Sequence, residues 1–275
     1  MKILIWNMNY WENTKGNNLD KVITWKNACI EYFKNESDID FFILQEINPI
    51  KLFEKNYNQY NFSMIDYNIL YHELTSELLY DGRRDNFWGN AIIYHKKYKL
   101  ENKNGLIDFS KSNRNYYGRS SLMCYEFLSN KNDKITIINY YNKINYANKG
   151  KYIDNEFNND EDIKNIIEKT KDKIILAGDF NKGFNKADKE KYNEFIELYN
   201  NKYNLIDSIP NYSNKFVPTS VYSRNGKDYL NDFCFTKNIT GELVNKKDEW
   251  ENIGNKKLWK GLSDHRALII DLKIE

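Results

Sequence analysis

Four short polar clusters carry the residue types that could do chemistry in this chain, and each of them closes an apolar run. They are Trp6-Asn7-Met8-Asn9, Leu44-Gln45-Glu46, Ala177-Gly178-Asp179-Phe180-Asn181 and Leu262-Ser263-Asp264-His265. Strand ends and loops on a rigid scaffold are where binding and catalytic side chains commonly lie. Together the clusters supply carboxylates, amides and one imidazole, which can hold a hard cation and transfer protons.

The oxygen-rich clusters favour Mg²⁺ or Mn²⁺ over zinc, because they lack the grouped cysteine and histidine residues of a zinc site. Mg²⁺ keeps several waters and takes one or two protein carboxylates, which leaves room for a substrate phosphate. The asparagine amides add neutral donors for phosphate oxygens. The residues therefore indicate a divalent-metal-dependent hydrolase of phosphate esters.

The elements that must position these clusters are predicted to be strands and a few helices. Helical spacing of apolar residues predicts one helix from about Leu19 and two more over 160–171 and 189–200. No repeat or proline-rich linker divides the chain, so we expect one domain over 1–275, with two packed sheets flanked by helices. The strands are predicted from apolar runs at 2–6, 41–44, 90–94, 121–127, 135–140, 174–177, 229–235 and 267–272.

The composition of the chain indicates where the protein acts in the cell, but it does not indicate the substrate. Lys and Arg number 41 against 39 for Asp and Glu, and this net charge of +2 neither requires nor excludes a polyanionic partner. The three cysteines lie in apolar runs without the spacing of a zinc or redox motif. No run approaches the roughly 18 apolar residues of a membrane span. We therefore expect a soluble, cytoplasmic monomer.

In order and spacing, the motifs resemble those of the endonuclease/exonuclease/phosphatase superfamily, which includes exonuclease III-like abasic-site endonucleases and deoxyribonuclease I. Besides the four clusters, they include Trp88-Gly89-Asn90-Ala91-Ile92-Ile93 and Gly118-Arg119. Each motif is weak alone, but all occur in order over nearly the whole chain. The resemblance implies an α/β fold of the α+β type, a four-layer α/β/β/α sandwich of two packed mixed sheets.

The resemblance also implies a metal site. Glu46 matches the principal metal carboxylate of the family, Asn7 matches the amide that helps to fix the metal and the phosphate, and Asp264 would also serve the metal. Asn9 stands where the abasic-site endonucleases carry an aspartate that can serve a second metal, which favours one metal here. A structural reading is open as well, in which Glu46 forms a salt bridge and Asn7 holds a turn.

Proton transfer and charge stabilisation are implied for a second group of residues. Asp179 resembles the residue that orients or deprotonates the attacking water, and Asn181 resembles its partner in gripping a phosphate oxygen. His265 would stabilise charge on the scissile phosphate. Asp232 would orient the imidazole and raise its pKa; without that role, a buried aspartate would need some other cation.

Other substrate contacts are less closely defined by the motifs. Tyr140 falls where family members carry a His or Tyr near the phosphate, with a register uncertain by one, and Asn139 and Asn142 compete for this role. Arg119 matches a family arginine that can also be structural. Arg83 and Arg84, with Lys143 and Lys149, are candidates for contacts with a nucleic-acid backbone, although a solvated surface would explain them equally.

The superfamily shares one phosphoesterase centre across DNA, RNA, nucleotides and lipid headgroups, so fold and centre do not determine the substrate. By resemblance to bacterial members, we expect a Mg²⁺- or Mn²⁺-dependent nuclease whose partner is a nucleic acid. The alternative is a phosphatase or phosphodiesterase of a small soluble or lipid-headgroup phosphate ester. A third class, a binding protein that kept the fold without catalysis, conflicts with the complete set of site residues.

Overall fold

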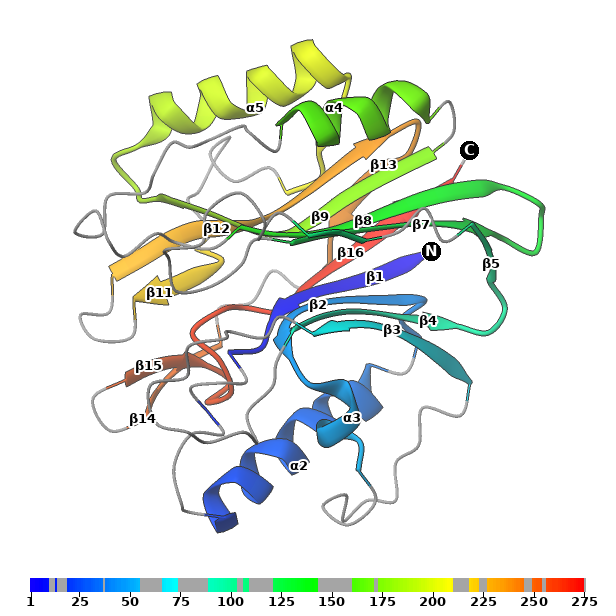
Figure 1. The fold of residues 1–275 in the computed structure, drawn as a ribbon. Helices are drawn as coiled ribbons and strands as arrows, with labels where there is room; N and C mark the ends of the chain where they lie inside the picture. Colours follow the sequence, from blue (N-terminus) through cyan, green and yellow to red (C-terminus); the bar gives the residue numbers. More distant parts are fainter. Residues whose placement is uncertain are drawn as a thin grey trace.

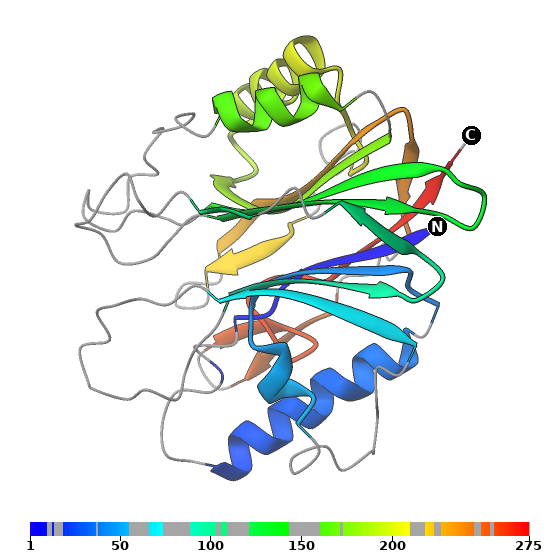
Figure 2. The ribbon, with the colours of Figure 1, turned by 45° about the vertical axis from the view of Figure 1, so that its right-hand side comes forward.

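Two β-sheets lie face to face in the computed structural model, and helices cover the outer face of each sheet (Figures 1 and 2). This arrangement confirms the predicted four-layer sandwich with two packed mixed sheets. The structure describes residues 1–9, 13, 19–36, 38–54, 66–73, 89–102, 106–108, 121–142, 160–170, 173–209, 218–222, 227–244, 249–253 and 256–274.

The first sheet has the strand order β13-β16-β1-β2-β4-β3. β1 and β2 run parallel, and the other neighbours are antiparallel. The first and last strands of the chain are therefore neighbours, and Figure 1 shows both termini on one side of the molecule. The strands are β1 (Lys2–Asn7), β2 (Phe41–Ile47), β3 (Tyr67–Glu73), β4 (Gly89–His95), β13 (Thr240–Leu243) and β16 (Leu268–Lys273).

The second sheet has the order β10-β12-β9-β8-β7-β5, with β11 beside β12 and β6 beside β7. Only β8 and β9 run parallel among these pairs. A separate hairpin of β14 (Trp250–Ile253) and β15 (Lys256–Trp259) precedes the last polar cluster. The strands are β5 (Lys99–Asn102), β6 (Leu106–Asp108), β7 (Ser121–Leu128), β8 (Lys134–Tyr141), β9 (Lys173–Phe184), β10 (Ile206–Asp207), β11 (Ser220–Tyr222) and β12 (Lys227–Lys237).

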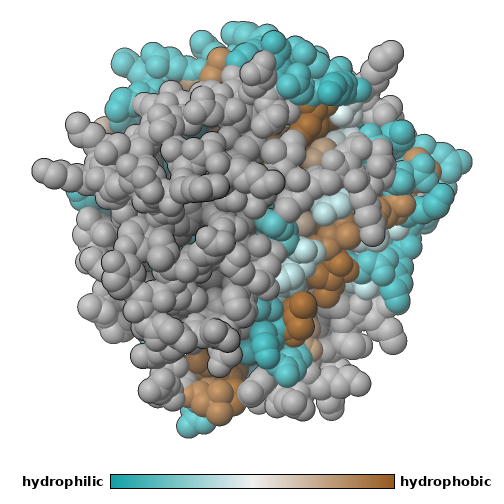
Figure 3. Space-filling view, viewed as in Figure 1, coloured by the Kyte–Doolittle hydropathy of each residue, from teal (hydrophilic) through white to brown (hydrophobic). Residues whose placement is uncertain are grey.

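The helices form the two outer layers. α2 (Leu19–Asn35) and the short α3 (Pro49–Leu52) lie on the first sheet, while α4 (Asp160–Lys169) and α5 (Lys189–Tyr203) lie on the second (Figure 1). Hydrophilic side chains cover the α4 and α5 layer, seen at the top of Figure 3. No helix in the described part of the chain is both long and apolar enough to cross a membrane.

The alternation of side chains along each strand explains why the strands appear as continuous apolar runs. In β1, Ile3 and Ile5 pack between the sheets, whereas Leu4 and Trp6 pack against α2. Successive side chains of a strand point to opposite faces, so a strand covered on both faces is apolar at every position. In the second sheet, the outer faces of β8, β9 and β12 pack in the same way against α4 and α5. Buried polar side chains inside such strands, as Asp179 in β9 and Asp232 in β12, are exceptions to this pattern.

Candidate active site

Asn7, the last residue of β1, joins all four polar clusters predicted from the sequence. Its side-chain Nδ2 donates hydrogen bonds to Oδ2 of Asp179 at 2.9 Å and to Oε1 of Glu46 at 3.2 Å. Its main-chain carbonyl accepts a hydrogen bond of 2.9 Å from the hydroxyl of Ser263. Asn7 is itself almost fully buried. The ends of β1 and β2, the middle of β9 and the loop before β16 therefore meet at Asn7. Because β9 continues to Phe184, Asp179 lies within this strand, although the sequence predicts that the apolar run and the strand end before it.

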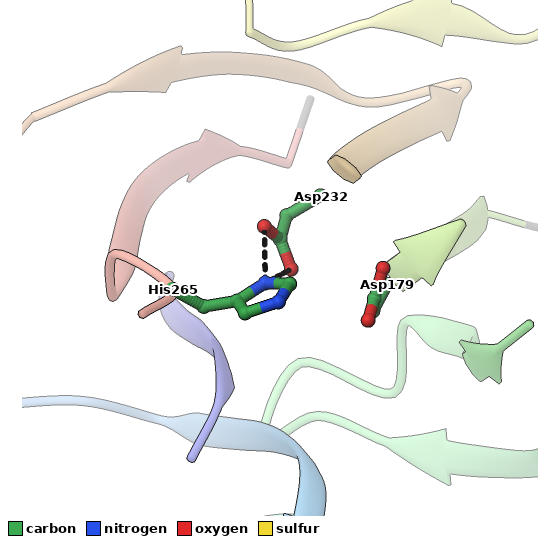
Figure 4. Close-up of side chains that lie close together, drawn as sticks. All are labelled: Asp179, Asp232 and His265. Carbon is green, nitrogen blue, oxygen red and sulfur yellow. Dashed lines mark hydrogen bonds and ion pairs between the residues drawn. The ribbon is translucent and has the colours of Figure 1, made fainter. Parts of the chain in front are cut away.

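Asp232 and His265 form a buried pair beside Asp179. Asp232 on β12 lies directly opposite Asp179 on β9. Nδ1 of His265 lies 2.9 Å from Oδ2 and 3.2 Å from Oδ1 of Asp232, and the other side of the ring faces Asp179 (Figure 4). Each of the three side chains offers an atom within 4.8 Å of those offered by the other two. The structure thus brings a carboxylate, an imidazole and a second carboxylate into one buried cluster.

The surroundings raise the pKa values of both His265 and Asp179, for different physical reasons. Burial alone would lower the pKa of His265, but the Asp232 and Asp179 carboxylates outweigh it and raise that pKa well above its usual value. Burial raises the pKa of Asp179 to about 8, assisted by Asp232 and Glu46 and opposed by His265 and Asn7. The surrounding carboxylates therefore favour the cationic form of His265, and burial favours the neutral form of Asp179.

The loop that carries His265 is fixed from the first sheet and from α2. The indole Nε1 of Trp6 donates to the carbonyl of His265 at 3.0 Å, and that of Trp25 donates to the carbonyl of Leu262 at 2.8 Å. The main-chain N–H of His265 donates to the hydroxyl of Ser263 at 3.1 Å. The tryptophan and serine of the Trp-Asn-x-Asn and Ser-Asp-His motifs thus hold the backbone from which the imidazole projects.

Unusual backbone conformations occur at several site residues. Asn9, Glu46 and Asn181 all have positive φ angles, of 48°, 48° and 51°. Asparagine adopts this left-handed conformation at small cost, but glutamate does so rarely, and such strain is concentrated at functional sites. Gly178 has φ of 140°, and a Cβ there would lie 2.0 Å from the carbonyl oxygen of Tyr140. Only glycine lets β9 approach β8 this closely just before Asp179.

Two further carboxylates, those of Glu46 and Asp264, are half-buried at the same edge. Oε1 of Glu46 also accepts a hydrogen bond of 2.8 Å from the hydroxyl of Tyr141, and Oδ1 of Asp264 accepts one of 2.7 Å from Nδ2 of Asn9. Within the described residues, neither carboxylate forms an ion pair with a lysine or arginine. The structural reading in which Glu46 forms a salt bridge is therefore not seen in this part of the chain.

The structure places Tyr141 rather than the predicted Tyr140 at the site. The Tyr140 ring packs on Phe180 with a centroid distance of 4.8 Å, in the core beneath α4 and α5. Tyr141 points the opposite way and reaches Glu46. Asn139, the other alternative, is fully buried between the sheets, where its Nδ2 donates to main-chain carbonyls of β2 and β4. The uncertainty of one position in the register is thereby resolved, because only alternate residues of a strand share a face.

Asn142 and Asn181 lie at the site and are bonded to each other. Nδ2 of Asn181 donates to the carbonyl of Asn142 and, at 2.8 Å, to Oδ2 of Asp179. Nδ2 of Asn142 donates to the carbonyl of Phe180 at 3.3 Å. The Asn181 amide thus positions Asp179 in this structure, and its contact with phosphate stays a prediction.

The predicted basic contacts lie outside the described residues. These are Arg83, Arg84, Arg119, Lys143 and Lys149. Their roles in substrate binding therefore stay predictions.

Comparison with known proteins supports the fold of this chain but does not show its activity. No model of a protein family and no curated protein matches the sequence. Among solved structures, an endonuclease/exonuclease/phosphatase family protein from Bacteroides thetaiotaomicron superimposes with a TM-score of 0.65 at 16% identity, covering 100% of this chain and 98% of that one. The human Nocturnin catalytic domain with a bound sulfate anion gives a TM-score of 0.65 at 15% identity, covering 100% and 93% of the two chains.

A third match, a truncated Caenorhabditis elegans TDP2, has a TM-score of 0.63 at 15% identity and covers 98% of this chain and 95% of that one. These matches span nearly the whole chain at low identity. The chain therefore has the fold of the endonuclease/exonuclease/phosphatase proteins, which confirms at the level of the fold the resemblance seen in its motifs.

Proposed function

We propose that this protein is a member of the endonuclease/exonuclease/phosphatase superfamily and a divalent-metal-dependent phosphoesterase. The observation that carries the proposal is the buried Asp232–His265 pair, which faces Asp179. The Asn7 side chain bonds to both Asp179 and Glu46 and so connects this pair with a further carboxylate. The sulfate anion bound to the Nocturnin catalytic domain supports it, because sulfate has the shape and charge of a phosphate group. Within this class we propose a nuclease, in line with the motifs that the chain shares with nucleases.

The residues at the site fit a hard cation. Glu46, Asp179, Asp232 and Asp264 bring four carboxyl groups to this site, and no described lysine or arginine forms an ion pair with any of them. Glu46, Asp264 and Asn7 would hold the metal, since they offer the oxygen ligands that Mg²⁺ and Mn²⁺ prefer. When bound, the ion supplies positive charge against the carboxylates and against charge that develops on the phosphate.

Asp179, Asp232 and His265 are a competing ligand set, because their ligand atoms lie close together. We favour the first set, because in it Nδ1 of His265 and the Asp232 carboxylate remain partners of each other and the imidazole is left to act on the phosphate. In the proposed reaction, Asp232 keeps the imidazolium oriented, and His265 donates a hydrogen bond to the phosphate as negative charge builds on it. Asp179 accepts a proton from the attacking water.

Two experiments test the proposal. The first incubates the purified protein and Mg²⁺ or Mn²⁺ with plasmid, single-stranded DNA, an abasic-site duplex, RNA and small phosphate mono- and diesters. We expect cleavage of a polymer that is abolished by EDTA and reduced roughly 10²-fold or more in His265→Ala. His95→Ala is the matched control, because His95 ends β4 at the opposite end of the sandwich and should retain activity. Activity confined to small esters would move the assignment to a phosphatase or phosphodiesterase.

The second experiment locates the metal by calorimetric titration of Mn²⁺ into wild type, Glu46→Gln and Asp232→Asn. If Glu46 is a ligand, Glu46→Gln weakens binding strongly while Asp232→Asn changes it little. The reverse pattern would assign the metal to the Asp179, Asp232 and His265 set instead.

A further inference from the structure

A buried threonine, Thr219, bonds to the backbone of Asp232 and to the backbone of Arg266, which follows His265. It lies just before β11 and is fully buried. Its side-chain Oγ1 accepts hydrogen bonds from the main-chain N–H of Asn231 at 2.9 Å and of Asp232 at 3.0 Å. One hydroxyl therefore fixes two successive peptide groups on the strand that carries the aspartate.

These two N–H groups lie where the regular pairing of β12 with β9 is interrupted. Leu230 is opposite Phe184, but Asp232 is opposite Asp179, so β9 contains additional residues at this point. The Asn231 side chain fills the irregular stretch, where its Oδ1 accepts from the N–H of Gly183 at 2.6 Å and its Nδ2 donates to Ser220 Oγ at 2.8 Å. Irregular pairing of this kind can change the direction of a side chain, and Asp232 is the first residue of the regular pairing that follows it.

The same short segment also holds the backbone around His265. The carbonyl of Thr219 accepts a hydrogen bond of 2.7 Å from the N–H of Arg266, and the N–H of Val221 donates to the carbonyl of Asp264 at 2.9 Å. Ser220 lies between these two bonds and forms an antiparallel bridge with His265. The residues on both sides of the histidine are thus bonded to the segment whose hydroxyl fixes Asp232.

We propose that Thr219 is a positioning residue that sets the Asp232–His265 contact by bonding to the backbone N–H of Asp232 and to that of Arg266, the residue after His265. The proposal rests on the proposed function, in which this pair acts on the phosphate. Two side chains from distant parts of the chain keep one hydrogen-bond geometry only when their backbones are tied together, and the Thr219 hydroxyl and carbonyl provide that tie. Residues that orient a reacting group through another commonly contribute roughly 10- to 100-fold in activity.

The test compares Thr219→Val, which keeps the size of the side chain without an acceptor, with Thr219→Ser, which keeps the hydroxyl. Thr236→Val is the matched control. Thr236 is a buried, hydrogen-bonded threonine on β12, the strand that carries Asp232, and it lies near the end of that strand. The first readout is the NMR signal of the His265 ring nitrogens, which can be assigned with His265→Ala because the chain has only 3 histidines. We expect this signal to shift in Thr219→Val and to stay unchanged in Thr219→Ser and Thr236→Val.

The second readout is activity on the best substrate of the panel. We expect kcat to fall roughly 10- to 100-fold in Thr219→Val with little change in KM, and to recover in Thr219→Ser. In an Asp232→Asn background, Thr219→Val should add much less than it does in wild type, because its effect passes through Asp232.

An unchanged His265 signal in Thr219→Val, or an equal effect in both backgrounds, would overturn the proposal. If Thr219→Val does not fold, Thr219→Cys takes its place, since sulfur is a weak acceptor. A wild type that hydrolyses nothing in the panel would refute the proposed function, whereas the NMR comparison would still decide whether Thr219 positions the pair.

Discussion

Replacing Asn139 by alanine should destabilise the protein strongly, because this side chain bonds across the two sheets. Asn139 is fully buried on β8. Its Nδ2 donates to the carbonyls of Leu44 and Ala91, at 3.0 Å each, and its Oδ1 accepts from Nε2 of Gln45 at 2.8 Å. These partners belong to β2 and β4 of the first sheet, so one side chain of the second sheet makes three bonds to the first.

The magnitude follows from these three bonds. A buried hydrogen bond contributes about 1 kcal/mol net, and a partner left buried without a bond costs about 1 to 3 kcal/mol. Asn139→Ala should therefore lower the free energy of unfolding by about 3 to 5 kcal/mol. Folded domains are stable by only about 5 to 15 kcal/mol, so the variant would lose a large part of its stability.

Urea unfolding followed by tryptophan fluorescence measures this change as a shift of the midpoint at constant slope. Thr136→Val is the matched control, since Thr136 is buried on the same strand and its hydroxyl has no hydrogen-bond partner among the described residues. This control should be neutral or slightly stabilising, because it removes a buried polar group that gains nothing. A loss below about 1 kcal/mol in Asn139→Ala would refute the reasoning, since it would equal no more than one ordinary hydrogen bond.

Three other changes test the site and the fold. Tyr141→Phe, which removes the hydroxyl bonded to Glu46, should lower kcat/KM more than Tyr140→Phe does in steady-state assays on one substrate. Asn9→Asp places a second carboxylate beside Asp264, so the metal-free protein should melt earlier and Mg²⁺ should raise its Tm more than in wild type, as measured by thermal unfolding. Burial raises the pKa of Asp207 to about 7, above its value in the unfolded chain, so its contribution to stability is present in acid and is lost as the pH rises towards 7. In urea unfolding at several pH values, the stability of wild type relative to Asp207→Asn should therefore fall between about pH 4 and pH 7.

Local sequence was sufficient for the elements that are apolar and buried. Every predicted strand is confirmed, and helices begin at Leu19, Asp160 and Lys189 as expected. The strands that no pattern predicted are short or lie at edges, such as β3 and the β14–β15 hairpin, and some of their neighbouring side chains are exposed together, as Asn68 and Ile69 are in β3. Their pairing depends on a neighbouring strand that is distant in sequence, so the sequence of the strand itself carries little signal.

The residues of the candidate site that lie within contiguous motifs could be predicted from the sequence. The prediction was less precise where the strand register determines which side chain faces the site. Apart from Asn139, the segment Ile137-Ile138-Asn139-Tyr140-Tyr141 is apolar or aromatic on both faces, so no clear alternation shows which tyrosine faces Glu46. Thr219 could not be found at all. Its importance comes from a hydroxyl that accepts bonds from a strand 12 residues further along the chain, and no spacing in the sequence indicates such a contact.

Neither sheet alone carries the candidate site. The first sheet supplies Asn7 and Glu46, the second supplies Asp179, Asp232 and Tyr141, and His265 follows the hairpin that separates β13 from β16. The apolar layer between the sheets holds them together, but hydrophobic packing is non-directional and does not by itself fix the position of one carboxylate against another. Directional contacts across the layer provide that position, from Asn7 to Asp179, from Tyr141 to Glu46 and from Asn139 to main-chain carbonyls of β2 and β4. The polar residues buried between the sheets therefore serve the geometry of the site as much as the stability of the fold.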